Sequence, residues 1–284
     1  KKGAILPFNW IAPLAMAASI AVLAGVAERS LPGFKPRTGW EVAAVSGAPR
    51  IATQRLHADA RLGVGQWLET DDTSRARVSV ANIGEVRLEP NSRLRLVDTS
   101  ATDHRVELAR GTLHALIWAP PRLFFVETPG ATAVDLGCAY TLSVDPNGGG
   151  VLEVTSGYVA LEHRGQESII RAGFKCLTRA KQGPGTPFSA EAPDPLRRAL
   201  ERFDFEANPA QRPSALADVL ALAGKDDAVT LWHLLKRAPR GQRGDVFDAL
   251  VQDHPAPASV TRAGILAGDA TMLNAWADEL GLRY

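Results

Sequence analysis

The chain contains two cysteines, Cys138 and Cys176, and each lies on the apolar face of an alternating stretch of sequence. Such a face points inward in a half-buried β-strand. If this part of the chain lies in an oxidising compartment, an inward-facing pair is well placed to form a disulfide, and this is what we expect. If it lies in the cytosol, both are small buried hydrophobic residues. Two cysteines cannot supply a disulfide-rich scaffold or a four-cysteine zinc site.

The other residue types that carry chemistry are scattered. No histidine has a second ligand at the spacing typical of a metal site, which applies to His57, His104, His114, His163, His233 and His254. Asp71-Asp72 precedes Thr73-Ser74 and indicates a turn rather than a catalytic pair. The sequence has no nucleophile elbow, no phosphate-binding loop and no His-Glu-x-x-His motif. We therefore predict that the protein is not an enzyme and uses no metal or other cofactor.

One loop indicates a binding role instead. Trp118 is followed by Ala119, Pro120 and Pro121. An exposed tryptophan among prolines suits contact with a partner, whereas the alternative is that it packs on its own sheet. We take Trp118, Pro120 and Pro121 as the candidate partner-binding loop.

The charge of the chain is balanced. Its 284 residues include 32 basic and 31 acidic residues, for a formal net charge of +1, and the lysines and arginines are dispersed along the sequence. This balance gives no reason to expect nucleic acid as a partner.

The N-terminal part of the sequence predicts a membrane segment. Residues 3–27 carry no charge, follow Lys1-Lys2 and precede Glu28-Arg29. About 20 apolar residues span a bilayer core as a helix, so residues 1–29 are predicted to form a transmembrane helix with its flank. A cleaved signal peptide and a buried core helix are the alternatives, because alanine makes the segment only moderately apolar. The first residue is Lys rather than Met, and we expect further sequence upstream of it.

Residues 38–180 consist of short alternating stretches separated by turn residues, such as "RARVSV" (75–80) and "VLEVTS" (151–156). Strands that recur at roughly 8 to 12 residues, with no amphipathic helix between them, predict an all-β domain of twisted antiparallel sheets, such as a sandwich. The strictest alternation runs over residues 132–144. We expect one strand there, with a bulge or a close backbone contact at Gly137.

The pattern changes after residue 180. Residues 181–194 are rich in Pro and Gly and are expected to form a linker between two domains. Residues 195–284 then show helical periodicity, and leucines recur at about every 15 residues, namely Leu220, Leu235, Leu250, Leu266 and Leu280. One helix and one turn per repeat predict a small α-helical repeat or bundle.

Six motifs of the β-region, in this order, resemble the FecR-type family of transmembrane sigma-factor regulators. They are "GQWLETDDTSRARV" (65–78), "GEVRLEPNSRLRL" (84–96), "VELARG" (106–111), "FVETP" (125–129), "VDLG" (134–137) and "SGYV" (156–159). The resemblance covers about residues 39–180. Most FecR-like domains have threonine where this chain has Cys138.

The resemblance implies a single-pass protein of the inner membrane with the bulk of the chain in the periplasm. Such a protein relays an envelope signal to an extracytoplasmic-function sigma factor, here through an anti-sigma segment upstream of Lys1. Its partners would be the membrane, the sigma factor and an envelope protein. An envelope-anchored structural module, or one that binds carbohydrate or protein, is the alternative. The helical C-terminal region departs from the better-known members, which end in a short mixed α/β domain.

Overall fold

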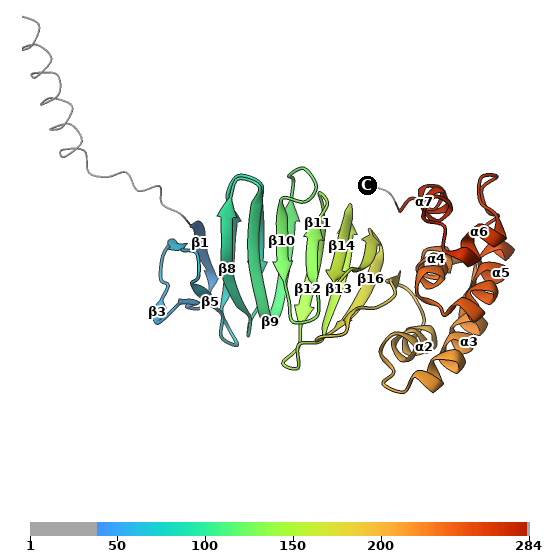
Figure 1. Ribbon diagram of the computed structural model, residues 1–284. Coiled ribbons are helices and arrows are strands. Elements are labelled where there is room, and N and C mark those ends of the chain that lie inside the picture. Colours follow the sequence, from blue (N-terminus) through green and yellow to red (C-terminus); the bar gives the residue numbers. More distant parts are fainter. Residues whose placement is uncertain (1–38, 283–284) are drawn as a thin grey trace, which may run out of the picture. The chain divides into compact units, whose positions relative to one another are not determined.

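The computed structural model describes residues 39–282, and the predicted transmembrane helix of residues 1–29 lies outside this range. No helix within residues 39–282 has both the length and the apolar character needed to cross a bilayer. The described chain forms a series of β-strands followed by a C-terminal set of helices (Figure 1). The predicted β-rich fold with a helical C-terminal region is therefore confirmed.

The strands form two sheets, A and B, that share the strand β9 (Asp103–Ile117). Sheet A also contains β1 (Trp40–Ser46), β4 (Ala60–Leu62), β6 (Arg75–Val80), β7 (Gly84–Leu88), β12 (Ala139–Val144), β13 (Gly150–Ser156), β16 (Phe174–Arg179), β17 (Gly183–Pro184) and β18 (Phe188–Ser189). Sheet B also contains β2 (Arg50–Ile51), β3 (Gln54–Arg55), β5 (Trp67–Glu69), β8 (Arg93–Ser100), β10 (Phe124–Glu127), β11 (Thr132–Asp135), β14 (Tyr158–His163) and β15 (Gln166–Arg171). Neighbouring strands are antiparallel except for β9 and β10, which are parallel.

The alternating sequence positions the core between the sheets. In β8, Leu94 and Leu96 are fully buried, whereas Arg93 and Arg95 are half-exposed on the outer face. The same alternation buries Val78 and Val80 in β6. Burial of a leucine or valine side chain contributes about 1.5–3 kcal/mol, so the inward rows supply most of the stabilisation of the sandwich.

β9 runs through two alternating stretches, "RVEL" (105–108) and "TLHALI" (112–117), although Arg110-Gly111 between them is a turn signal in the sequence. Its first half pairs with β8 and β10 in sheet B, and its second half pairs with β7 and β12 in sheet A. The strand changes sheets at Gly111, where φ is +93°. Ser92 lies against this bend, and its Oγ accepts a 2.9 Å hydrogen bond from the Thr112 N–H. A residue without a Cβ is needed here because the backbone of Ser92 occupies the space beside Gly111.

The stretch 132–144 is not one strand, although its alternation is unbroken. It forms β11 in sheet B and β12 in sheet A. Between them Gly137 has φ +87°, a left-handed conformation that breaks the strand. Period-two alternation does not reveal the break, because the alternating positions stay apolar across it. In the structure Val134 and Leu136 pack in a small separate cluster, whereas Cys138, Tyr140 and Leu142 join the main core.

Residues 181–194, the expected linker, contain β17 and β18, which pair with β16. Residues 183–188 are buried. The Ser168 hydroxyl donates a 2.9 Å hydrogen bond to the Gly185 carbonyl, which further ties this segment to β15. The segment that we expected to be a linker between domains is thus packed against the sheet.

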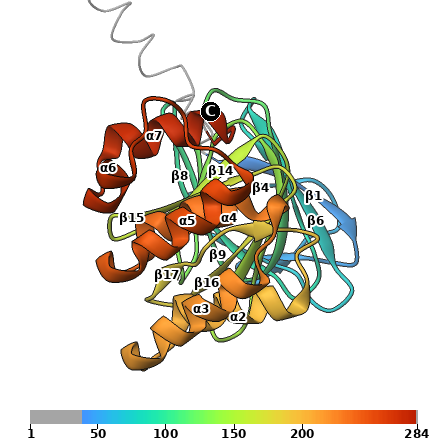
Figure 2. The same ribbon diagram turned by 90° about the vertical axis from the view of Figure 1, so that its right-hand side faces the viewer.

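The helices pack on the β14–β18 end of the sandwich (Figure 2). They are α2 (Asp194–Phe205), α3 (Arg212–Leu222), α4 (Ala228–Arg237), α5 (Arg243–Asp253), α6 (Arg262–Ala267) and α7 (Ala270–Glu279). The edge strand β15 pairs only with β14 among the described strands. His233 of α4 covers this edge, since its Nε2 lies 3.0 Å from the Ile169 carbonyl oxygen and must donate the hydrogen. Covering an edge strand in this way prevents it from pairing with another chain.

We predict that Gly111→Ala lowers the free energy of unfolding by about 3–5 kcal/mol, because strain at positive φ adds to overpacking. The new Cβ would lie 2.5 Å from the Ser92 Cβ and closer still to its Cα. The matched control is Gly65→Ala, since Gly65 has φ +83° with nothing within 4 Å of its Cβ position. The control should lose only about 1–2 kcal/mol. Urea unfolding measures both, and equal losses would show that the contact with Ser92 is unimportant.

Candidate functional site

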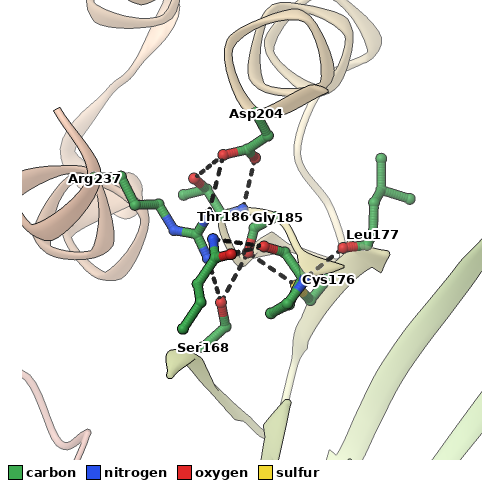
Figure 3. Close-up of polar contacts among 9 residues, drawn as sticks. Ser168, Cys176, Leu177, Gly185, Thr186, Asp204 and Arg237 are labelled. Atoms are coloured by element: carbon green, nitrogen blue, oxygen red, sulfur yellow. Dashed lines mark hydrogen bonds and ion pairs between the residues drawn. The ribbon is translucent and has the colours of Figure 1, made fainter. Parts of the chain in front are cut away.

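The most elaborate polar site of the described chain is a junction between the sheets and the helices (Figure 3). The guanidinium of Arg237, at the end of α4, reaches between the strands. Its Nη2 donates to the Ser168 hydroxyl at 2.6 Å and to the carbonyls of Pro184 and Gly185 at 3.0 Å each. The Arg237 side chain is 13% exposed, so these hydrogen bonds replace most of its contact with water.

Asp204 of α2 supplies the opposite charge. Its side chain is 4% exposed, and its Oδ1 lies 3.5 Å from Arg237 Nη1. Its two oxygens also accept hydrogen bonds from the N–H of Thr186 at 2.6 Å and from the Thr186 hydroxyl at 2.9 Å. Burial raises the pKa of Asp204, and Arg237 and Thr186 oppose that rise. One ion pair therefore joins two helices to the segment that leaves the sheet.

Cys176 of β16 lies beside this junction. Its thiol donates to the Gly185 carbonyl at 3.2 Å, and burial raises the pKa of the thiol to about 12. A thiol that remains protonated at neutral pH is a poor nucleophile, so Cys176 acts here as a core residue.

The structure does not join Cys138 to Cys176, and both are free, buried thiols in place of the expected disulfide. Leu152 of β13 pairs with both Leu142 and Cys176, which places Cys176 two strands away from Leu142. Cys138 precedes Leu142 by four residues. These offsets give a separation of roughly 16 Å from ordinary strand spacings, whereas a disulfide needs Cα atoms within about 7 Å. The sequence placed both residues on inner faces but could not give their register.

Cys138 instead belongs to a second buried group, where the chain passes from β11 to β12. Its thiol donates to Asp135 Oδ2 at 2.7 Å, and the Gly137 N–H donates to Asp135 Oδ1 at 2.7 Å. Asp135 is 1% exposed, and burial raises its pKa to about 6 despite these two donors. Burial and the nearby Asp135 also raise the pKa of Tyr140. The carboxyl group of Asp135 thus stabilises the turn at Gly137, and its raised pKa means that it ionises less readily than an exposed carboxyl group.

The candidate partner-binding loop is exposed. Trp118 is 63% exposed, which is the largest value among the exposed large hydrophobic residues of the described chain. Its Nε1 donates to the Asn82 carbonyl at 3.2 Å, and this hydrogen bond orients the ring. Pro120 and Pro121 are also exposed, and the intervening Ala119 is buried. Trp118 is therefore mostly exposed to solvent, and its side-chain hydrogen bond is to the loop between β6 and β7.

The remaining candidates for chemistry are structural. No group of three or more potential metal ligands occurs among residues 39–282. Asp71 Oδ1 accepts hydrogen bonds from the backbone N–H groups of Thr73 and Ser74, as expected for the predicted turn. Hydrogen bonds from the Ser74 side chain and from the Thr73 backbone are the main causes that lower the pKa of Asp71 to about 2. Asp204 and Arg237 are not predicted from the sequence, because they lie 33 residues apart on helices whose polar positions carry no recognisable motif.

Comparison with known proteins gives one family. Residues 66–160 match the family model described as FecR protein, which confirms the resemblance over β5 to β14. Two solved chains of a candidate anti-sigma factor from Parabacteroides distasonis are similar at 15% and 14% identity, with TM-scores of 0.38 and 0.39. In each case the match covers 43% of this chain and 59% of that chain. Similarity this low carries no conclusion about function. No curated protein matches the chain.

We predict that Asp204→Ala destabilises the protein by about 3–5 kcal/mol, because it leaves the buried guanidinium of Arg237 without a counter-charge. The matched control is Asp218→Ala, which removes a 2.9 Å ion pair with Arg202 whose two side chains are 50% and 56% exposed. The control should cost no more than about 1 kcal/mol. Thermal unfolding compares the two variants, and a loss at Asp204 as small as that at Asp218 would refute the role of the junction.

We also predict that Asp135 makes the folded protein less stable as pH rises. Its pKa in the folded state is about 6, above the ordinary value of 3.8. The neutral form is therefore favoured by folding, and stability falls between about pH 4 and pH 6 by roughly 3 kcal/mol from this group. Asp135→Asn should remove that slope, because an amide does not ionise in this pH range. The turn should be retained, because the amide oxygen can still accept the hydrogen bond from the Gly137 N–H. The exposed Asp72→Asn is the control, and urea unfolding at several pH values should show the slope unchanged in it. A slope that persists in Asp135→Asn would assign it to another group.

Proposed function

We propose that the protein is a single-pass membrane regulator whose FecR-like domain lies outside the cytoplasm and relays an envelope signal to an extracytoplasmic-function sigma factor. The observation that carries this proposal is the FecR match over residues 66–160. The charge-free stretch at residues 3–27 supports the membrane anchor. The relay would run through an anti-sigma segment upstream of Lys1, and the bulk of the chain would be periplasmic.

The described architecture suits recognition of a protein. The two sheets form a scaffold whose centre, β9, is bonded to four other strands. The Trp118 loop follows directly from the end of β9, so its position is fixed by the most connected strand of the domain. A large exposed aromatic side chain on a rigid scaffold is a typical binding anchor.

The same loop favours a second candidate function, that of an envelope-anchored module that binds carbohydrate or protein without any role in transcription. Exposed tryptophans serve both kinds of recognition. The two functions differ in whether a set of promoters responds to the protein.

Deletion of the gene should change the transcripts of one sigma-factor regulon, and the wild-type chain supplied from a second locus should restore them. If the Trp118 loop receives the envelope signal, Trp118→Ala should restore protein level but not the signal-dependent response. Leu222→Ala, at a residue 43% exposed on α3, is the control that should restore both. RNA sequencing with immunoblotting of the protein makes the measurement. If no regulon responds to the deletion, the second candidate function stands.

A further inference from the structure

Arginines that are dispersed in the sequence meet in one row on the outer face of sheet B. The backbone register places Arg55 opposite Arg50, and Arg93 opposite Arg110, with Glu69 between Arg50 and Arg93. The row therefore runs across β3, β2, β5, β8 and β9. Ile51, Leu68 and Leu94, which are adjacent to Arg50, Glu69 and Arg93, point into the core and are buried. Arg55 and Arg110 are exposed. The arginine side chains accordingly lie on the solvent face.

The row and its neighbours have an excess of positive charge. Glu69 Oε1 lies 2.9 Å from Arg93 Nε, and in the next row Glu107 forms an ion pair with Arg95. Within residues 39–282, no ion pair joins Arg50, Arg55 or Arg110 to a carboxylate, and all three are exposed. Within the row itself, four arginines against one glutamate leave a local charge of +3 on a chain whose formal net charge is +1.

This arrangement works against the stability of the sheet. Like charges directly opposite each other on neighbouring strands repel, and the row contains two such pairs, Arg50 with Arg55 and Arg93 with Arg110. Trp67 lies beneath two guanidiniums, with Arg93 4.1 Å and Arg95 5.1 Å from its ring centre. The tryptophan thereby holds two of the cations in place. A local arrangement that is unfavourable for folding yet well ordered indicates a binding role.

We propose that this arginine row binds the phosphate groups of an anionic membrane surface. Arginine matches the geometry of phosphate oxygens with paired donors, and four strand spacings make the row roughly 19 Å long, enough to contact several lipid headgroups. Two strands of the row, β2 and β3, follow β1 soon after the predicted membrane segment, since β2 begins at Arg50. The choice of a membrane over an acidic protein rests on the anchoring in the proposed function. Contact with the bilayer would orient the sandwich relative to the membrane.

The test uses the full chain with vesicles of phosphatidylcholine alone and with an equal mixture of phosphatidylcholine and phosphatidylglycerol. Flotation with phosphatidylcholine vesicles reports the apolar segment, and the excess on mixed vesicles reports the arginines, so the two ideas can fail separately. Because both native thiols are buried, a solvent-sensitive dye can be attached through Gln54→Cys, at an exposed position beside Arg55. If the apolar segment already binds all of the chain to both kinds of vesicle, the dye emission still reports whether the arginine row contacts the lipid headgroups.

We expect at least tenfold stronger binding to the mixed vesicles, since each arginine near an anionic surface contributes about fivefold, and we expect high salt to remove the excess. The dye emission should shift to the blue on the mixed vesicles alone. Arg50→Gln/Arg55→Gln/Arg110→Gln should abolish both effects. The control Arg77→Gln/Arg198→Gln/Arg240→Gln removes the same charge from exposed positions outside the row and should retain them.

Equal binding and equal emission on the two kinds of vesicle would overturn the proposal, as would an equal loss in the control variant. Poly-glutamate provides the remaining alternative. The row belongs to an acidic protein partner instead if three results occur together. Poly-glutamate binds the wild-type chain, the row substitutions abolish that binding, and the mixed vesicles show no excess binding. Circular dichroism of both triple variants verifies that the sheets are intact.

Discussion

The change of sheets within β9 is the constraint on which the rest of the fold depends. One strand is hydrogen-bonded to β8 and β10 in sheet B and to β7 and β12 in sheet A. The bend requires Gly111, and Ser92 fills the space that a side chain would need. Because the two halves of the strand belong to different sheets, neither sheet can shift without the other. The inward rows of both sheets therefore keep one register and enclose one core.

The junction between Asp204 and Arg237 extends this order to the helices. A buried ion pair is costly to desolvate, and its partners here are satisfied by Ser168, Thr186 and two carbonyls. The site joins α2 and α4 to residues 184–186 through hydrogen bonds of defined direction, which apolar contacts do not provide. It also explains why the segment between the strands and the helices is packed against the sheet. The regulator proposed here would thus present its helices and its sheets to a partner as one unit.

The sequence predicted the secondary-structure elements well, but it predicted the contacts between them poorly. Period-two alternation located β6 and β16 because each has one buried face, and helical periodicity located α2 through Leu196, Ala199, Leu200 and Phe203, all of which are buried. It could not show that 132–144 crosses between sheets, since the alternating positions stay apolar while they pass from a small separate cluster to the main core. Nor could it give the separation of Cys138 and Cys176, the pairing of Asp204 with Arg237 or the alignment of Arg50 with Arg55. These depend on register and on contacts between distant segments, which a local pattern does not encode.

The covering of β15 has a consequence for the order in which the protein can mature. The Tyr158 hydroxyl donates to the Gly281 carbonyl and Arg171 donates to the Leu280 carbonyl, across 123 and 109 residues of sequence. During synthesis, β14 and β15 are complete long before the residues that close over them exist. If the sandwich of a nascent chain folds at that stage, its last edge is still open. In that interval a chaperone, or any other chain with a free strand, has access to a surface that the finished molecule hides.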